Sequence, residues 1–111
     1  MLVTSPLSGQ ILPYNDNGST SGAVSINLDD GTHVFNLTGY TDLNVSAGEP
    51  GKGARLLVKR DNLGTWDMST PAGWKWVGVR QTIDPGSAEE LEVLLLPLSD
   101  GTILASIRSI I

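Results

Sequence analysis

A chain of 111 residues is long enough for one domain with a modest hydrophobic core and too short for two independent domains. It carries 12 acidic and 7 basic residues, and its net charge of -5 repels phosphate backbones and anionic lipid headgroups, which argues against nucleic acid and membrane surfaces as partners. It contains no cysteine, so disulfides, thiolate metal sites and a thiol nucleophile are excluded.

The N-terminal segment is predicted to be a flexible arm. Residues 1–21 are rich in Ser, Gly, Asn and Pro, a composition typical of loops. They contain neither the basic region nor the hydrophobic stretch of a secretion signal, so we expect a soluble protein made in the cytoplasm without a cleaved leader. A single β-sandwich domain is then expected over residues 22–111.

Apolar alternation over residues 23–38 surrounds the dipeptide Asp30-Gly31. Asp-Gly suits the positive φ angles of a two-residue turn, so the pattern predicts a β-hairpin with one buried face. The expected pairs on that face are Leu28 with His33, Ile26 with Phe35, and Val24 with Leu37.

The middle of the chain reads as short strands between turns rich in Gly, Pro, Asn and Asp. Residues 55–60 are expected to form a buried strand. Further short strands are expected at residues 41–45, 65–68 and 74–79. No segment gives a convincing helix, because residues 87–96 begin like a capped helix but run into Pro97 and a second Asp-Gly turn.

The second Asp-Gly dipeptide, Asp100-Gly101, predicts a C-terminal hairpin by the same two-residue rule. One face would pair Leu98 with Ile103, Leu96 with Ala105, and Leu94 with Ile107. The reverse face would pair Pro97 with Leu104, Leu95 with Ser106, Val93 with Arg108, and Leu91 with Ile110. Both faces would then be largely apolar, and a terminal hairpin rarely has its own chain on both sides.

The reverse face of this hairpin is therefore predicted to be a subunit interface. Its residues are Leu91, Val93, Leu95, Leu104, Arg108 and Ile110. Together these elements predict an all-β fold, a small antiparallel sandwich or barrel of about eight or nine short strands with few or no helices.

No grouping of residues indicates catalysis, and we predict that the chain is not an enzyme. His33 is the only histidine, and the sequence offers it neither a nucleophile nor an orienting carboxylate. Asp29-Asp30-Gly31 lacks the alternating acidic spacing of a calcium loop. No catalytic, cofactor-binding or metal-binding residue is predicted, and no cofactor.

Three tryptophans, Trp66, Trp74 and Trp76, form a candidate ligand platform. Exposed indoles stack on sugar rings, and Trp74 and Trp76 are two residues apart, so on a strand they face the same side. Burial in the core is the competing explanation for all three side chains.

From residue 22 to the end, the order of features resembles a domain found in bacteriophage structural proteins of the tail tip, the fibre and the head decoration. The matching runs are AVSINL at 23–28 with Asp30-Gly31, VFNLTGYTDLNV at 34–45, PGKGARLLVK at 50–59, Gly64, Pro71, WKW at 74–76, and the closing hairpin. The chain departs from the pattern because it lacks a Gly-rich run after Lys59 and because it ends in Ile110-Ile111. The resemblance implies a β-rich, usually trimeric virion component without enzymatic activity.

The expected function is thus a non-enzymatic virion structural protein, made in the host cytoplasm. It would self-associate as a homotrimer and attach to the phage capsid as a decoration or stabilising protein, with capsid or tail proteins as partners. The alternative is a tail-fibre or carbohydrate-binding module that recognises a surface glycan through its tryptophans.

Overall fold

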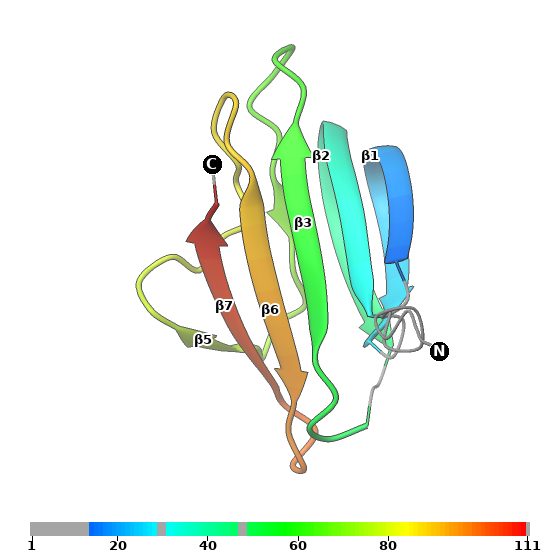
Figure 1. Ribbon diagram of the computed structural model, residues 1–111, viewed down its shortest axis with the longest axis vertical. Helices are drawn as coiled ribbons and strands as arrows, with labels where there is room; N and C mark the ends of the chain where they lie inside the picture. The colour runs from blue at the N-terminus through cyan, green and yellow to red at the C-terminus, as the bar shows by residue number, and fades with distance from the viewer. Residues whose placement is uncertain (1–13, 29–30, 47–48, 111) are drawn as a thin grey trace, which may run out of the picture.

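The computed structural model describes residues 14–28, 31–46 and 49–110, and its N-terminal half is built on two long strands that each fold back on themselves. β1 (Tyr14–Asn27) and β2 (Thr32–Ser46) pair in parallel, from Tyr14 beside Thr32 to Asn27 beside Ser46. Each strand runs along one layer, bends, and returns along the other, as the curved ribbons in Figure 1 show. β2 therefore repeats the course of β1.

Glycines make these bends possible. Gly18 and Gly22 in β1 have φ angles of +59° and +75°, a region that residues with a Cβ rarely adopt. The pairing with β2 shifts register on both sides of residues 19 and 20, which lie at the bend. In β2, a Cβ on Gly39 would lie 3.0 Å from the Cβ of Ser21, so any other residue there would require the two bends to shift apart by a few tenths of an ångström.

The hairpin predicted at Asp30-Gly31 is wrong. Ile26 lies beside Val45 in a parallel register, whereas the hairpin required it to lie opposite Phe35. Gly31 has the positive φ angle expected of the turn, +84°, but it precedes β2, which pairs in parallel with β1. Asp30 lies outside the described residues. The alternation itself was correct, because a strand with one buried face alternates in the same way whichever direction its neighbour runs.

The remaining strands pair directly or indirectly with β2 and complete the two layers. β3 (Ala54–Arg60) pairs in parallel with the first half of β2, and β4 (Met68–Ser69) pairs in parallel with its second half. β6 (Leu91–Pro97) is antiparallel to β3, β7 (Ile103–Ser109) is antiparallel to β6, and β5 (Lys75–Val77) is parallel to β7. The strand order is β1-β2-β3-β6-β7-β5, with β4 attached to β2 (Figure 1).

The prediction of a small all-β sandwich is confirmed, with a mixed sheet in place of a wholly antiparallel one. One layer contains β3, β6 and β7 with the first halves of β1 and β2, and the second halves of β1 and β2 with β4 lie behind it. The described residues contain seven strands and no helix. Fewer strands are present than expected because the predicted strand at 41–45 is the second half of β2.

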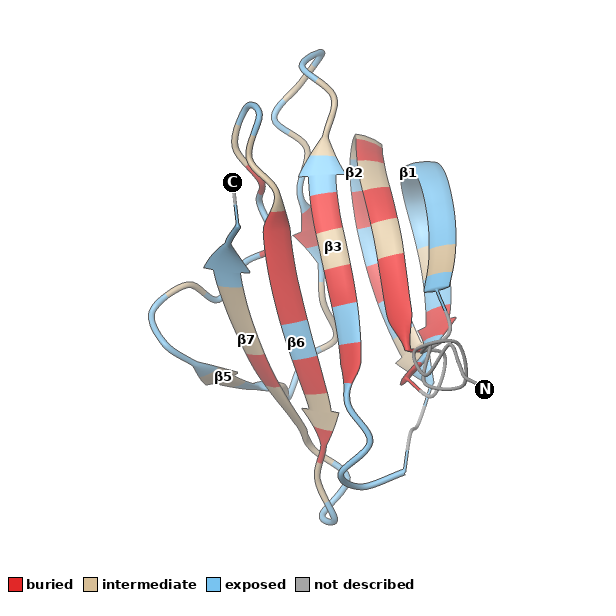
Figure 2. Ribbon diagram, viewed as in Figure 1, coloured by how far each residue is buried: buried red, intermediate tan, exposed pale blue. Residues whose placement is uncertain are grey.

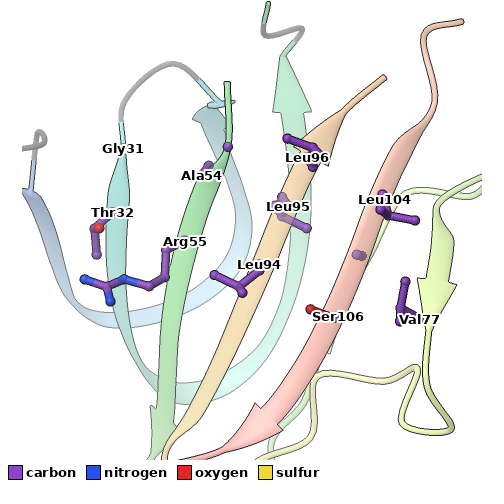
Figure 3. Close-up of a pocket in the computed structure, with 12 residues that line it drawn as sticks. Gly31, Thr32, Ala54, Arg55, Val77, Leu94, Leu95, Leu96, Leu104 and Ser106 are labelled. Carbon is purple, nitrogen blue, oxygen red and sulfur yellow. The ribbon is translucent and has the colours of Figure 1, made fainter. Parts of the chain in front are cut away.

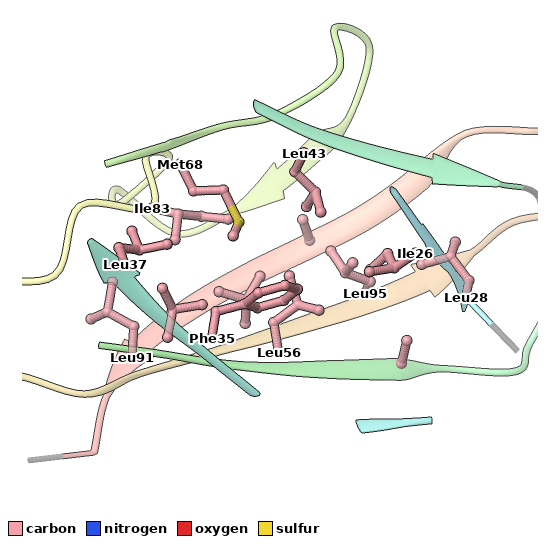
Figure 4. Packing of buried hydrophobic residues seen from close by; sticks show 14 residues of the cluster. Ile26, Leu28, Phe35, Leu37, Leu43, Leu56, Met68, Ile83, Leu91 and Leu95 are labelled. Carbon is pink, nitrogen blue, oxygen red and sulfur yellow. The ribbon is translucent and has the colours of Figure 1, made fainter. Parts of the chain in front are cut away.

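The hydrophobic core fills the space between the two layers, and side chains from both layers meet there (Figure 4). Its buried apolar members are Ile26, Leu28, Phe35, Leu37, Leu43, Ala54, Leu56, Val58, Met68, Ile83, Leu91, Val93, Leu95 and Ala105. His33 is also buried, with its ring stacked 6.2 Å from that of Phe35 and its Nδ1 3.5 Å from Nδ2 of Asn17. His33 thus lies on the buried face of β2, the face on which the sequence pattern placed it.

The boundary predicted for the N-terminal arm is too far along the chain. Residues 14–21 belong to β1 and pair with β2, whereas the rest of the predicted arm, residues 1–13, lies outside the described residues. The sandwich therefore includes at least eight residues that the sequence assigned to the arm.

Two arginines, Arg60 and Arg80, anchor the loops between β3 and β6. The Arg60 guanidinium donates hydrogen bonds to the carbonyl oxygens of Pro85 at 2.7 Å and Gly64 at 2.7 Å, which ties two loops to the end of β3. The Glu89 carboxylate accepts from Arg80 Nη2 at 2.8 Å and from the Gly86 backbone N–H at 2.9 Å. The Arg80 hydrogen bond and the Gly86 N–H lower the pKa of Glu89 to about 2.

Glu89→Gln should destabilise the fold at neutral pH by about 1.5–3 kcal/mol, because it removes charge-assisted hydrogen bonds. The Glu89 pKa is lower in the folded chain, so its contribution is complete above about pH 4.5 and is lost as the pH falls towards 2. Denaturant unfolding should therefore show that the difference in free energy of unfolding between wild type and Glu89→Gln shrinks over that range. Glu90→Gln is the control, since the described residues offer the Glu90 side chain no hydrogen bond. If the difference in stability between wild type and Glu89→Gln did not change with pH, the ionic role of Glu89 would be contradicted.

Candidate interaction surface

The C-terminal hairpin is present, but its loop has three residues. The Leu98 N–H donates to the Thr102 carbonyl at 2.8 Å and the Gly101 N–H donates to the Leu98 carbonyl at 3.0 Å, which closes a turn over residues 99–101. Gly101 has a φ of +87°, the left-handed position that this loop type requires. Asp100 also accepts a hydrogen bond from the Thr102 N–H at 3.0 Å.

The extra loop residue moves the pairing by one position. Leu95 lies beside Ala105 and Val93 beside Ile107, whereas the prediction placed them beside Ser106 and Arg108. A slip of one residue turns one strand's side chains to the opposite face relative to the other strand. The predicted pairs thus combined inward positions of β6 with outward positions of β7.

The predicted interface is corrected accordingly. Leu91, Val93 and Leu95 are at most 1% exposed and lie in the chain's own core, where a partner subunit cannot reach them. Leu104, Arg108 and Ile110 lie on the other side or at its edge and remain accessible to different degrees. Along β6, Figure 2 shows a single exposed band between buried ones, and the exposed residue is Leu94.

The outward side chains of β3, β5, β6 and β7 form one continuous surface, which we call the outer face. Its members are Arg55, Leu57, Lys59, Lys75, Val77, Glu92, Leu94, Leu96, Leu104, Ser106 and Arg108. Leu94 and Val77 are 46% and 54% exposed, values that leave large apolar side chains in contact with water. No other layer of the described residues covers this face.

A groove of about 590 Å³ crosses the outer face. Leu94, Leu96, Leu104 and Val77 supply large apolar side chains to its lining, and Arg55 projects over the same face (Figure 3). Small residues such as Gly31, Gly53 and Ala54 also line it, which leaves the surface hollow between the larger side chains. The apolar lining makes this groove the candidate interaction site of the described residues.

An ion triad lies at the opposite end of the same face from the hairpin loop. Glu92, whose side chain is only 7% exposed, accepts a hydrogen bond from Arg108 Nε at 2.5 Å and one from Arg55 Nη1 at 3.4 Å. Arg55 and Arg108 are 47% and 70% exposed. The acid is thus covered by two guanidinium groups that still reach solvent, and the triad presents positive charge outward.

The three tryptophans do not form a common platform. Trp66 donates from Nε1 to Asp61 Oδ1 at 2.7 Å and meets the Tyr40 ring edge-to-face at 5.2 Å. Trp74 and Trp76 lie 5.6 Å apart with their rings tilted by 48°. All three indoles are partly buried and pack against the core.

A second groove, of about 420 Å³, lies beside Trp74. Ser46, Pro71 and Thr102 also line it, so it combines one indole with hydroxyl groups. Of the three predicted platform residues, only Trp74 reaches this groove.

Within residues 14–28, 31–46 and 49–110 no metal-binding group is formed. Groups of three or more His, Asp or Glu side chains that could hold a metal ion do not occur there. No helix in this part of the chain is long and apolar enough to cross a membrane.

Sequence reasoning missed Leu94, Leu96, Val77 and Arg55 as members of the accessible surface. The signal that could have found them was the alternative three-residue loop, since Ser99-Asp100-Gly101 satisfies it equally well. That register would have assigned Leu94 and Leu96 to the same face as Leu104.

Comparison with protein-family models, with curated proteins and with solved structures gives no match to this chain.

Proposed function

We propose that the chain is a non-enzymatic structural component of a bacteriophage virion, which self-associates as a trimer and attaches to the capsid as a decoration or stabilising protein. The observation that supports the proposal best is the outer face, because it combines an apolar groove with exposed Leu94 and Val77 and is covered by no other described layer. Apolar surface of this kind is stabilised by burial against another protein surface.

The outer face replaces the reverse face of the hairpin as the proposed subunit interface. Leu104 and Arg108 stay in the proposed interface. Leu94, Leu96 and Val77 replace the three predicted residues that are buried in the core, which are Leu91, Val93 and Leu95. The sequence resemblance to phage structural domains is the ground for the virion and for the trimer. Arg108 is already paired with Glu92 in its own subunit, so burying it in an interface does not leave an isolated charge.

The proposal is tested by measuring mass and binding directly. Light scattering coupled to size-exclusion chromatography at micromolar concentration should give three times the chain mass. Purified protein should then sediment with capsids that lack decoration and remain in the supernatant without them. A stable monomer that does not sediment with capsids or tails would overturn the proposal.

The glycan-binding alternative depends on the groove beside Trp74. Adding oligosaccharides should quench or shift tryptophan emission if that groove takes a sugar, and Trp74→Ala should abolish the change. Because the indoles pack against the core, we expect blue-shifted emission that does not respond to sugars. A sugar-dependent change lost in Trp74→Ala would favour the alternative.

A further inference from the structure

The charges of this chain are distributed unequally between the outer face and the rest of the molecule. Four basic residues, Arg55, Lys59, Lys75 and Arg108, point outward from β3, β5 and β7. Among the outward side chains of β3, β5, β6 and β7, Glu92 is the only acidic one, and it lies beneath two of the arginines. Beside the face, Asp100 of the hairpin loop pairs with Lys75 at 3.5 Å, and Asp16 lies on the same side of the layer in β1. The face is therefore cationic and apolar at once.

The remainder of the chain has the opposite character. It holds eleven of the twelve acidic residues and only three of the seven basic ones. On the second layer, for instance, Asp42 is exposed on the outward side of β2, where Asn44 and Ser46 follow it at alternate positions. The net charge of -5 thus divides into +3 on the outer face, from four basic residues and one acidic residue, and -8 on the rest of the chain.

This distribution discriminates between the two ways in which identical subunits can meet. In an isologous contact the same patch serves both subunits, so Arg55, Lys59 and Arg108 of one copy would face the same cations of the other. In a heterologous contact the outer face of one copy meets a different surface of the next copy, drawn from the part of the chain with net negative charge. Like-charge juxtaposition disfavours the first arrangement, and electrostatic complementarity favours the second.

We infer that the outer face is a docking surface for a second copy of this chain, bound head-to-tail. The second copy contacts the outer face of the first through an acidic surface that is not part of its own outer face. The apolar groove around Leu94 supplies the area buried from water, and the surrounding cations set the orientation. The inference rests on the self-association in the proposed function and adds to it the geometry of the contact. A heterologous contact is also the kind that closes a ring of three, whereas an isologous contact alone yields a dimer.

A mixing experiment separates the two geometries. Leu94→Asp disables the outer face but leaves the acidic surfaces of that copy intact, so in a head-to-tail contact an untagged wild-type chain still binds it. Affinity-tagged Leu94→Asp should therefore retain wild-type chain while failing to associate with itself, with self-affinity lowered about tenfold or more. Val77→Asp is the second variant, and Val79→Asp is the control that should associate normally, because Val79 is fully exposed after the end of β5 and does not line the groove.

Charge is tested separately with a matched pair of reversals. Lys59→Glu, on the outer face, should weaken self-association about fivefold, and raising the salt concentration from 0.05 to about 0.5 M should reduce that difference. Lys52→Glu, in the loop before β3 and off the outer face, should leave association unchanged.

The outcomes distinguish this inference from the proposed function. Wild type that self-associates but does not bind tagged Leu94→Asp would show an isologous contact, and would overturn the head-to-tail inference while leaving self-association intact. Self-association that is indifferent to both salt and Lys59→Glu would also overturn it. Binding of an anionic polymer such as heparin to the outer face, with the chain itself monomeric, would overturn both.

Discussion

Val93→Asp is expected to prevent folding. Val93 is fully buried on β6, between Leu56 of β3 and Ile107 of β7 in the pairing of the sheet. A carboxylate there would be transferred from water into an apolar core without a partner, a change that costs more than about 4–5 kcal/mol and thus a large part of the stability of a small domain. Circular dichroism and urea titration should show no cooperative transition at 25 °C.

Leu94→Asp is the matched control, because the next residue along β6 points to the outer face. It gives up only the partial burial of one side chain, about 1 kcal/mol, and should unfold cooperatively close to the wild-type midpoint. The pair therefore tests the register of the hairpin. A folded, monomeric Val93→Asp would restore the original assignment of Val93 to a subunit interface and refute the observed one.

Gly64→Ala is expected to destabilise the packing around Trp66. A Cβ on Gly64 would lie 2.4 Å from Cζ2 of the Trp66 indole, a distance at which one of the two groups must move. The indole cannot move freely, because its Nε1 is bonded to Asp61 and its ring meets Tyr40. The overpacking should cost about 1–3 kcal/mol and change the near-ultraviolet circular dichroism of the tryptophan.

Gly86→Ala provides the comparison within the same group of loops. Its nearest new contact would be an ordinary 3.6 Å to Glu89, and we expect a change in the free energy of unfolding within about 0.5 kcal/mol. Equal denaturation midpoints for the two alanine variants would show that the Trp66 indole is not fixed over Gly64.

The sequence was sufficient for those parts of the fold that depend on local chemistry. Alternation identified β3 to within one residue, with Ala54 as the addition, and it placed β6 and β7 around the Asp100-Gly101 turn. The absence of helix over residues 87–96 followed from Pro97 and the same turn. These assignments held because each rests on residues adjacent in the chain.

The errors arose where two backbone geometries fit the same residues. Asp100-Gly101 suits a two-residue and a three-residue loop equally well, and the choice decided which face of β6 met which face of β7. In β1, the Gly- and Ser-rich stretch that permits a bend within a strand has the same composition as a flexible arm. Parallel pairing of β1 with β2 depends on those bends, so it could not be predicted from alternation.

The doubled-back course of β1 and β2 has a mechanical consequence. In most sandwiches the layers are joined by loops at their rims, and the apolar contacts between them resist shear. Here two strands pass from one layer into the other and pair on both sides of the bend, with register shifts at the bend itself. Sliding one layer over the other would strain the backbone of both strands and break the hydrogen bonds between them. The edge of the sandwich at the glycine bends should therefore resist shear.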